Sequence, residues 1–401
     1  MPYQTLNNID CVHKVVLLRV DLNVPITNNK VTDTTRIERL LPTIRELLKA
    51  QAKIVILSHF GRPKPNNDPA LWDKAHSLKN ILSSVESIFQ VPVIFVDKCV
   101  GEDVQNAISA ANWGSVILLE NLRYYPGEEA NDPEFAEQLA KLGDIYVNDA
   151  FSCSHRAHAS VTSITQYLPS VAGRAMQGEL EHLDKALTTP KHPVVAIVGG
   201  SKISTKLDLL LNLSHKVDTL VIGGGMANTM LAAQGIDVGQ SLFEPNLLDT
   251  ARRILTESKA EIILPDDVVV AADLNDGTNS YMVAANAIPG DQKVFDIGPL
   301  TVEKIKSYLD RASTIVWNGP VGAYEYAPFD QATTKIAQHV AVLTSTRGVI
   351  SVAGGGETVE SLGKAGVTDK FSYVSTAGGA FLEWLEGKTL PGVAALEKAG
   401  E

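Results

Sequence analysis

The sequence predicts an α/β protein built from two Rossmann-like, three-layer α/β/α domains with parallel sheets. Two observations lead to this fold class. Short apolar segments alternate with longer amphipathic ones in both halves of the chain, as in parallel strands joined by covering helices. The chain also has 401 residues, which is long for one core and fits two domains of roughly 150–200 residues each.

Strand-like and helix-like segments follow one another in regular order in the first half. A strand with its exit loop over 15–25 precedes a helix over 36–51, whose apolar residues recur at helical spacing. The same alternation then continues. We expect strands at 53–57, 91–96, 115–120 and 144–149, and helices at 77–90, 101–111 and 132–143.

One long amphipathic segment interrupts this order between the halves. Its apolar positions are Met176, Leu180, Leu183 and Leu187. We interpret 176–192 as a helix that connects a first domain, 1–175, to a second domain, 193–389.

The alternation resumes in the second half and leaves a short tail. The strands expected there are 194–198, 219–223, 261–265, 281–285, 314–318, 349–354 and 371–376. The tail 390–401 packs on one of the two domains, and packing on the first is among the possibilities.

Net charge, cysteine content and the length of apolar runs indicate which partners and which cellular compartment to expect. The formal net charge of −11 argues against nucleic acid as a partner, because neutralising a phosphate backbone needs excess basic charge. The three cysteines form no disulfide or metal pattern, and Cys153 is interpreted as a small buried residue rather than a reactive thiol. No leader-like start or bilayer-length apolar run is seen, so we expect a cytoplasmic protein without a membrane partner.

Polar residues follow the first predicted strand. Asp21 and Asn23 stand two apart directly after it, so both side chains face the same way and could bind a hydroxylated ligand. The alternative is an Asx turn that ends the strand. Arg36 opens the next helix, where a cation opposes the helix dipole. That conflict indicates an anionic partner or, alternatively, an exposed surface arginine.

Three further strands of the first half also run into Arg or His. His59 and Arg62 follow one strand, Arg123 follows the next, and Arg156 lies in the run 154–160. Each alone would be an ordinary surface charge. At the carboxyl ends of successive parallel strands, however, such groups predict a site for a small, multiply charged phosphate or carboxylate.

Glycine clusters follow the strands of the second half instead. They lie at 198–202, 222–227, 353–358 and 376–380. Such loops let backbone amides and helix N-termini hold phosphate. The Walker A pattern GxxxxGK[ST] does not occur in the sequence. The GxGxxG pattern is also absent, because the sixth positions of the two GGG runs are Asn228 and Val359 instead of glycine.

Charged residues accompany these glycines. Lys202 and Lys206 have helical i, i+4 spacing, which predicts that both lie on one helix face and reach toward a triphosphate. Glu357 and Thr358 open a predicted helix, where an acid serves as a cap or as a Mg²⁺ ligand. Glu325 lies in a loop after 314–318 and is either a ribose ligand or an ordinary loop acid.

A predicted anion-binding site in the first half and predicted phosphate-binding loops in the second half together predict phosphoryl transfer. A nicotinamide-dependent dehydrogenase is the first alternative, and the missing GxGxxG counts against it. The second alternative is a non-catalytic, two-lobed anion-binding protein. It needs no second phosphate site, so Lys202, Lys206 and the glycine loops count against it.

Taken in order, these segments resemble the phosphoglycerate kinases along essentially the whole chain. The matching runs are RVDLNVP, SHFGRP, ENLRYYPGE, NDAF…HRAH, GGSKISTKL, GGGMA, VWNGPVGAYE, GGGET and STAGGA…LEGKTLPGV. The resemblance implies that the first domain binds 3-phosphoglycerate and the second binds MgATP or MgADP. It further implies reversible phosphoryl transfer between 1,3-bisphosphoglycerate and ADP in glycolysis and gluconeogenesis, by closure of an interdomain hinge. We expect a monomer.

The resemblance also implies a set of site residues. The implied catalytic residues are Arg36, Lys202, Lys206 and Gly378. The implied substrate-binding residues are Asp21, Leu22, Asn23, Arg36, His59, Phe60, Gly61, Arg62, Arg123 and Arg156. The implied nucleotide-binding residues are Lys206, Glu325, Gly355, Gly356, Glu357 and Thr358, with Glu357 also the metal ligand.

Three places depart from the family pattern. Glu357 stands where the family usually has Asp, which changes the reach to the metal. Ala377 replaces the first of three glycines, and its methyl group would interfere if the position needed positive φ. Ser152 and Cys153 stand where the family tends to have Gly and Thr.

Overall fold

The computed structural model describes residues 3–28 and 30–400. The chain divides into two compact units, Met1–Leu180 with Thr389–Glu401 (unit 1) and Glu181–Lys388 (unit 2). The division falls within helix α7, Arg174–Leu183, which continues as a π-helical turn, η8, over Asp184–Thr188. This helical segment starts and ends earlier than the expected 176–192. It stops before Pro190, because the residue preceding a proline is biased away from helical backbone.

The described strands of unit 1 include a six-stranded sheet in the order β5-β6-β4-β1-β7-β8, and all its pairings are parallel. Its strands are β1 (Val15–Arg19), β4 (Lys53–Leu57), β5 (Val93–Val96), β6 (Val116–Leu119), β7 (Ile145–Asn148) and β8 (Ser170–Ala172). The first five match strands predicted from the sequence, and β8 was not predicted. With only three residues, β8 is too short to show a periodic pattern.

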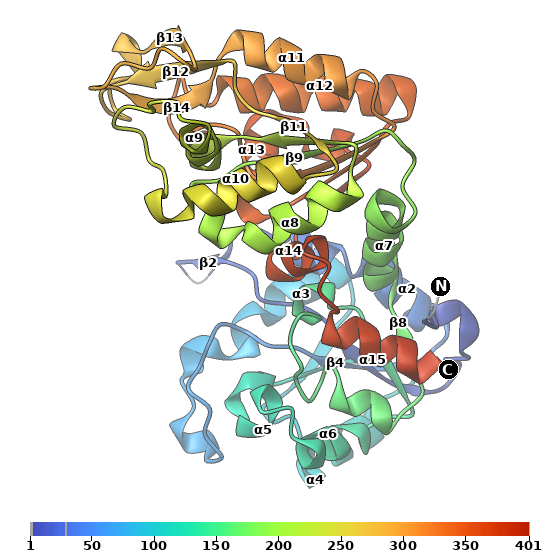
Figure 1. Cartoon of the computed structure of the whole chain (residues 1–401). Coiled ribbons are helices and arrows are strands. Elements are labelled where there is room, and N and C mark those ends of the chain that lie inside the picture. Colours follow the sequence, from blue (N-terminus) through green and yellow to red (C-terminus); the bar gives the residue numbers. More distant parts are fainter. Residues whose placement is uncertain (1–2, 29, 401) are drawn as a thin grey trace. The chain divides into compact units, whose positions relative to one another are not determined.

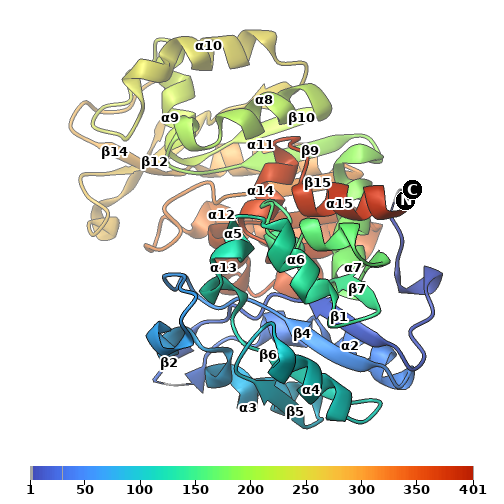
Figure 2. The same ribbon diagram turned by 90° about the horizontal axis from the view of Figure 1, so that it is seen from below.

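Alternate residues of these strands enter two different cores. Leu18 and Ile56 join a cluster that includes Ile44 of a helix on one face of the sheet. Leu17 and Val55 join a second cluster with residues of α4 (Glu102–Ala110) and α6 (Pro133–Ala140) on the other face (Figure 2). Because successive side chains of a strand point to opposite faces, a strand that is apolar throughout needs helices on both sides. Unit 1 therefore has the predicted three layers.

The predicted helices of unit 1 occur in the predicted order, but 36–51 is divided and 77–90 begins as the 3₁₀ turn Leu78–Ile81. The described helices of unit 1 are α1 (Thr35–Glu38), α2 (Leu41–Lys49), α3 (Leu82–Phe89), α4 (Glu102–Ala110), α5 (Pro126–Glu129), α6 (Pro133–Ala140) and α15 (Pro391–Gly400). The predicted helix 36–51 is two helices, because Pro42 lacks an amide hydrogen and occupies the first turn of α2. The C-terminal tail forms α15, whose Gly392 amide donates to the Ser154 carbonyl of unit 1 at 2.9 Å.

Short elements complete unit 1. They are η1 (Leu6–Asn8), β2 (Ile26–Thr27), β3 (Lys30–Val31), η2 (Pro69–Leu71), η3 (Lys74–His76), η4 (Leu78–Ile81), η5 (Leu122–Tyr124), η6 (Phe151–Cys153) and η7 (Ser163–Gln166). Strands β2 and β3 pair as a small antiparallel hairpin.

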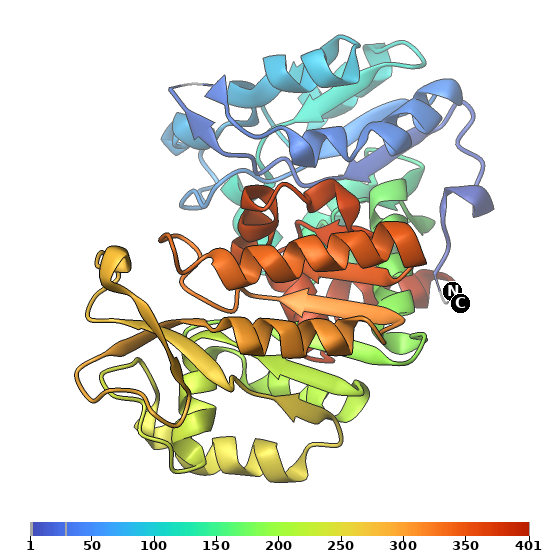
Figure 3. The ribbon, with the colours of Figure 1, turned by 90° about the horizontal axis from the view of Figure 1, so that it is seen from above.

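A second parallel sheet forms the centre of unit 2, with six described strands in the order β11-β10-β9-β15-β16-β17. They are β9 (Val194–Val198), β10 (Thr219–Ile222), β11 (Glu261–Ile263), β15 (Thr314–Asn318), β16 (Ile350–Gly354) and β17 (Tyr373–Ser375). Ile197, Ile315 and Trp317 pack with residues of α11 and α12 on one face (Figure 3).

The predicted strand 281–285 does not belong to that sheet, which corrects the expected simple alternation. It is β13 (Tyr281–Ala284), in a separate antiparallel sheet of order β13-β12-β14 with β12 (Asp267–Ala271) and β14 (Lys293–Ile297). The outer strand β13 is largely exposed, whereas Val268 and Val270 of β12 are buried against Leu231. Only the partner strands show that the segment pairs antiparallel.

The described helices of unit 2 flank these sheets, and α11 and α12 lie side by side (Figure 1). They are α8 (Leu207–Lys216), α9 (Gly224–Ala233), α10 (Leu248–Glu257), α11 (Pro299–Leu309), α12 (Gln331–Arg347), α13 (Gly356–Lys364) and α14 (Gly379–Leu385). The short turns are η9 (Ile203–Thr205), η10 (Pro245–Leu247), η11 (Gly277–Asn279) and η12 (Thr368–Lys370). Across the described residues, no helix combines the length and apolar character needed to cross a bilayer.

Candidate active site

The basic residues of unit 1 follow four neighbouring strands of one parallel sheet. Strands β6, β4, β1 and β7 are adjacent, and Arg19 at the end of β1 lies level with Leu57 of β4 and Asn148 of β7. The loops that leave these strands therefore start at the same sheet edge. They carry Asp21, His59, Arg62, Arg123 and Arg156.

Asp21 and Arg36 form an ion pair at this edge. The Arg36 Nη1 donates to Asp21 Oδ2 at 2.7 Å and to the Asn23 carbonyl at 3.0 Å. The Asn23 amide donates to Asp21 Oδ1 at 2.9 Å, so the Asx turn considered from the sequence is present. Burial opposes ionisation of Asp21, but the Arg36 guanidinium and the Ser152 hydroxyl together hold its pKa below the usual range. Arg36 thus already has an anionic partner.

A second interaction connects the β1 and β4 loops. The Gly61 amide donates to the side-chain oxygen of Asn23 at 2.9 Å. The Leu22 amide donates to the Ser58 hydroxyl at 3.0 Å, which ties the same two loops together at buried positions. The predicted residues Leu22, Asn23 and Gly61 are therefore brought together by the fold.

His59 is buried against the guanidinium of Arg19. The Arg19 Nη2 lies 3.3 Å from His59 Nδ1, and the two side chains are nine-tenths or more covered. Burial, together with Arg19, Arg123 and Arg36, lowers the pKa of His59 to about 3. His59 is therefore neutral at neutral pH, and its ring can accept or donate a hydrogen bond without carrying a charge.

Arg123 and the β4 loop are also linked. Arg123 Nη1 donates to the Gly61 carbonyl at 2.6 Å, and Nε lies 3.1 Å from Glu129. The Asn121 side chain bridges to the main chain of Phe60 in both directions. Arg62 and Arg156 are exposed. Two exposed guanidinium groups thus accompany loops that are joined by hydrogen bonds.

Sequence reasoning missed the buried charges behind this surface. Arg19 Nε donates to the Ser160 hydroxyl at 2.8 Å, and Ser160 in turn donates its hydroxyl to the Glu128 carboxyl at 2.6 Å. Arg19 and Glu128 are almost wholly buried and lie 4.0 Å apart. An arginine inside the apolar run VVLLRV was the available signal, because a charge in a buried strand needs a partner.

The glycines of unit 2 bring its loops into backbone contact. A Cβ on Gly199 would lie 1.7 Å from the Pro320 carbonyl oxygen, and one on Gly225 would lie 2.4 Å from the Ser201 carbonyl oxygen. Gly224 has φ +66 and passes equally close to Gly200. These glycines are required by loop packing, a role the sequence reading did not assign.

Lys206 is held by carbonyl groups in this cluster. Its Nζ donates to the Gly199 carbonyl at 2.6 Å and to the Asn318 carbonyl at 3.2 Å. Burial lowers the pKa of Lys206 to about 8, and the negative charge of Glu357 partly opposes that shift. Lys206 is therefore mostly charged at neutral pH and close to a strand end.

The predicted shared helix face for the two lysines is wrong. Lys202 has extended backbone before the turn η9, and Lys206 is only the N-cap residue of α8. The segment between them is a single 3₁₀ turn, so the i, i+4 spacing does not place them on one helix. Lys202 is exposed, unlike Lys206.

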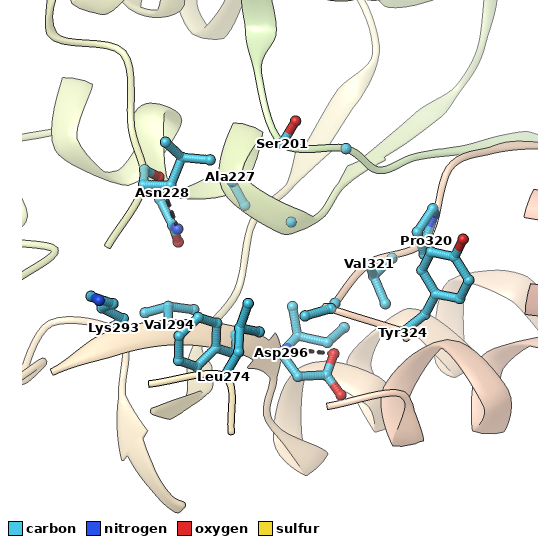
Figure 4. A pocket seen from close by; sticks show the side chains of 18 of the residues that line it. Ser201, Ala227, Asn228, Leu274, Lys293, Val294, Asp296, Pro320, Val321 and Tyr324 are labelled. Carbon is cyan, nitrogen blue, oxygen red and sulfur yellow. Dashed lines mark hydrogen bonds between the residues drawn. The ribbon is translucent and has the colours of Figure 1, made fainter. Parts of the chain in front are cut away.

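A pocket of about 500 Å³ opens beside these loops in unit 2 (Figure 4). Glycine loops and apolar side chains such as Val294, Leu274 and Val321 line the pocket. Asn228, Glu325 and Glu357 supply polar lining. A mainly apolar pocket with a few polar groups suits an aromatic ring joined to a polar tail.

The start of α13 follows the predicted pattern. Gly355 is the N-cap with φ +98, and Glu357 lies in the first turn. The Thr358 hydroxyl accepts a hydrogen bond from the Gly319 amide at 2.7 Å. Nothing lies within 4 Å of a Cβ placed on Gly356, so its backbone faces open space.

A further loop precedes α14. Gly378 has φ +55 and caps this helix, and a Cβ placed there would meet nothing within 4 Å. Ala377 is not among the described non-glycine residues with positive φ. The backbone at this position therefore accepts an alanine without the strain that a positive φ would have caused.

Comparisons with known proteins identify the family to which a chain with these two units belongs. The sequence model of the family named phosphoglycerate kinase matches residues 6–388. The chain belongs to the phosphoglycerate kinase family. It is 55% identical over 402 residues to the phosphoglycerate kinases of Sinorhizobium medicae and Rhizobium meliloti, covering 99% of this chain and 100% of each relative.

Solved structures of phosphoglycerate kinases also share its fold. The structure from Coxiella burnetii aligns with a TM-score of 0.92 at 40% identity and covers 100% of both chains. The structure from Pyrococcus horikoshii aligns with a TM-score of 0.82 at 29% identity, covering 99% of both. The predicted family, fold class and phosphotransferase activity with a carboxyl acceptor are confirmed.

Proposed function

We propose that this phosphoglycerate kinase moves a phosphoryl group reversibly between 1,3-bisphosphoglycerate and ADP, with the glycerate bound by unit 1 and the nucleotide by unit 2. The observation that carries the proposal is the contrast between the two strand edges. One edge gathers Arg36, His59 and Arg123, whereas the other is a glycine-lined pocket beside the half-buried ammonium of Lys206. The first suits a small polyanion and the second a nucleotide.

In unit 1, we assign the hydroxyl and carboxylate region of the glycerate to Asp21 and Asn23. The basic groups bind its phosphate and carboxylate oxygens by charge-assisted hydrogen bonds. They are Arg36, Arg62, Arg123 and Arg156. The neutral ring of His59 contributes a hydrogen bond, and Leu22, Phe60 and Gly61 contribute loop backbone. Arg36 is assigned to the transferring group, which requires it to exchange Asp21 for the ligand.

In unit 2, Lys206 contacts the nucleotide phosphates and Lys202 contacts the phosphoryl group in transfer. Glu325 takes the ribose hydroxyls, and the amides near Gly355, Gly356, Thr358 and Gly378 bind phosphate. The Glu325 assignment is supported by its position in the lining of the pocket, beside apolar residues suited to the base.

The residues present fit a magnesium ion at this site. The side-chain oxygen of Asn318 is buried without a hydrogen-bond partner in the structure, and Glu357 lies within electrostatic reach of Lys206. Mg²⁺ needs only one or two carboxylates beside phosphate oxygens and water, so the lack of a three-ligand His, Cys, Asp or Glu cluster within 3–28 and 30–400 is no objection. When bound, the ion neutralises phosphate charge. Glu357 and Asn318 would hold it.

Phosphoryl transfer asks the protein for positioning and charge stabilisation rather than covalent chemistry. Ligands held by different units must approach each other for an in-line transfer, so the proposal includes closure about a hinge. Closure would also exclude water that hydrolyses the acyl phosphate. We further propose a cytoplasmic, monomeric enzyme that binds neither nucleic acid nor membrane.

Isothermal titration tests the assignment of two ligands to two sites. 3-Phosphoglycerate and MgADP are titrated singly and together into the wild type and Arg36→Ala. We expect wild type to bind both, and Arg36→Ala to retain its MgADP affinity while turnover falls by about two orders of magnitude or more. Binding of only one ligand, or equal loss of MgADP affinity in the variant, would contradict the assignment.

A further inference from the structure

Asp21 receives hydrogen bonds from three directions, and one of them comes from a residue outside the assigned site. Its Oδ2 accepts from Arg36 Nη1 at 2.7 Å and also from the Ser152 hydroxyl at 2.6 Å. Its Oδ1 accepts from the Asn23 amide at 2.9 Å. Asp21 is 8% exposed, so these donors replace most of its hydration.

We propose that Ser152 is a positioning residue for Arg36 that acts through Asp21. The inference rests on the proposed role of Arg36 at the transferring phosphoryl group. To reach that group, Arg36 must leave an oxygen to which it is hydrogen-bonded. A buried carboxylate that loses a donor without replacement is costly. Ser152 keeps a donor on that same oxygen, which lowers the cost of releasing Arg36.

The backbone around Ser152 is held independently of its hydroxyl. The Cys153 amide donates to the Ala150 carbonyl at 3.0 Å, and the Ser154 amide donates to the Phe151 carbonyl at 2.9 Å. Phe151 and Cys153, on either side, are buried. The side chain of Ser152 can therefore be changed while η6 keeps its place.

The other polar neighbour of the hydroxyl does not explain its orientation. Ser152 Oγ lies 3.8 Å from Cys153 Sγ, a weak contact beside the 2.6 Å bond to Asp21. Sulfur is a poor hydrogen-bond partner, and hydrogen bonds to ionised oxygens are about twice as strong as neutral ones. The carboxylate therefore dictates where the hydroxyl points.

Two substitutions of equal shape separate the hydroxyl from the volume of the side chain. Ser152→Thr keeps the hydroxyl, whereas Ser152→Val replaces it by a methyl group. We expect Ser152→Thr to retain a kcat near wild type. We expect Ser152→Val to lower kcat about ten- to a hundredfold, consistent with loss of one hydrogen bond to a charged group. The KM for ATP stays unchanged, because the nucleotide binds unit 2.

Ser152→Ala adds no atoms and must show the same loss as Ser152→Val. Ser163→Ala is the matched control. Its hydroxyl is buried and donates to the Asn131 side-chain oxygen at 2.8 Å, outside the substrate site. We expect that control to leave kcat unchanged, and thermal unfolding of each variant checks that it is folded.

A double-mutant cycle with Asp21→Asn tests the route of the effect. In the Asp21→Asn background no carboxylate holds Arg36, so Ser152→Val should change kcat less than twofold. A full loss in that background, or equal kcat for the Thr and Val variants, would overturn the proposal. A wild type that binds both ligands without transferring phosphate would instead contradict the proposed function itself.

Discussion

Lys206 provides the sharpest prediction because its proton should depend on the nucleotide. Its half-buried ammonium donates to two carbonyl groups, and this partial burial lowers its pKa from 10.5 to about 8. At pH 8, about half of the free enzyme carries a neutral Lys206. A phosphate ligand favours the charged form, so binding of MgADP should restore the proton.

The magnitude follows from the same pKa. We expect uptake of about 0.1 proton at pH 7, about 0.5 at pH 8 and about 0.9 at pH 9 when MgADP binds. Apparent affinity should be nearly constant below pH 7 and fall about tenfold for each pH unit well above 8.

The stability of the fold should change with pH in the opposite direction to the affinity for MgADP. A lysine whose pKa is lower in the folded state destabilises the fold most at pH values below the folded pKa. Stability attributable to Lys206 should therefore rise between pH 8 and 10.5, by about 3 kcal/mol as an order of magnitude.

Calorimetry in paired buffers measures the proton directly. MgADP is titrated at pH 8 in two buffers with different ionisation enthalpies, and the difference in observed heat gives the number of protons taken up. Lys206→Arg retains the positive charge, but arginine titrates above this pH range. Proton uptake on MgADP binding should therefore vanish in this variant. Lys206→Met should lose both uptake and affinity. Wild-type uptake near zero at pH 8, or undiminished uptake in Lys206→Met, would refute the reasoning.

Three further predictions concern the loops of unit 2. Gly199→Ala should destabilise the fold by about 2 kcal/mol or more in denaturant unfolding, because its Cβ would meet the Pro320 carbonyl oxygen at 1.7 Å. Gly356→Ala has free space for its Cβ and should keep the stability of the wild type within about 1 kcal/mol. Equal losses would count against loop packing as the reason for Gly199. Ala377→Gly should lower stability by about 0.5–1 kcal/mol through the unfolded chain, with kcat unchanged within twofold, and a large gain in kcat would mean that the alanine obstructs the site.

The basic edge of unit 1 could be predicted because parallel strands impose a common direction. Once β1, β4, β6 and β7 were recognised as successive parallel strands, the residues after them had to start at one sheet edge. This argument needs no knowledge of side-chain contacts. It placed His59 and Arg123 in the same region, although they are 64 residues apart in the sequence.

The lysines of unit 2 show where periodic reasoning fails. Lys202 and Lys206 have helical spacing, yet the chain between them forms a 3₁₀ turn. The pattern records separation along the sequence only. Contacts of Lys206 with the Gly199 carbonyl, which lies nearby in sequence, and with the Asn318 carbonyl at the end of β15, which lies far away in sequence, determine its position.

The sequence by itself determined the fold class, the two-part organisation and the residue types of both strand edges. Periodicity, chain length and the position of charges after apolar runs are local properties, so they can be read directly. Only the tertiary structure decided that β13 belongs to an antiparallel sheet, that Gly199 is required by the Pro320 carbonyl, and that Ser152 shares the Asp21 carboxylate with Arg36. These features depend on contacts between separate segments of the chain, which no local pattern specifies.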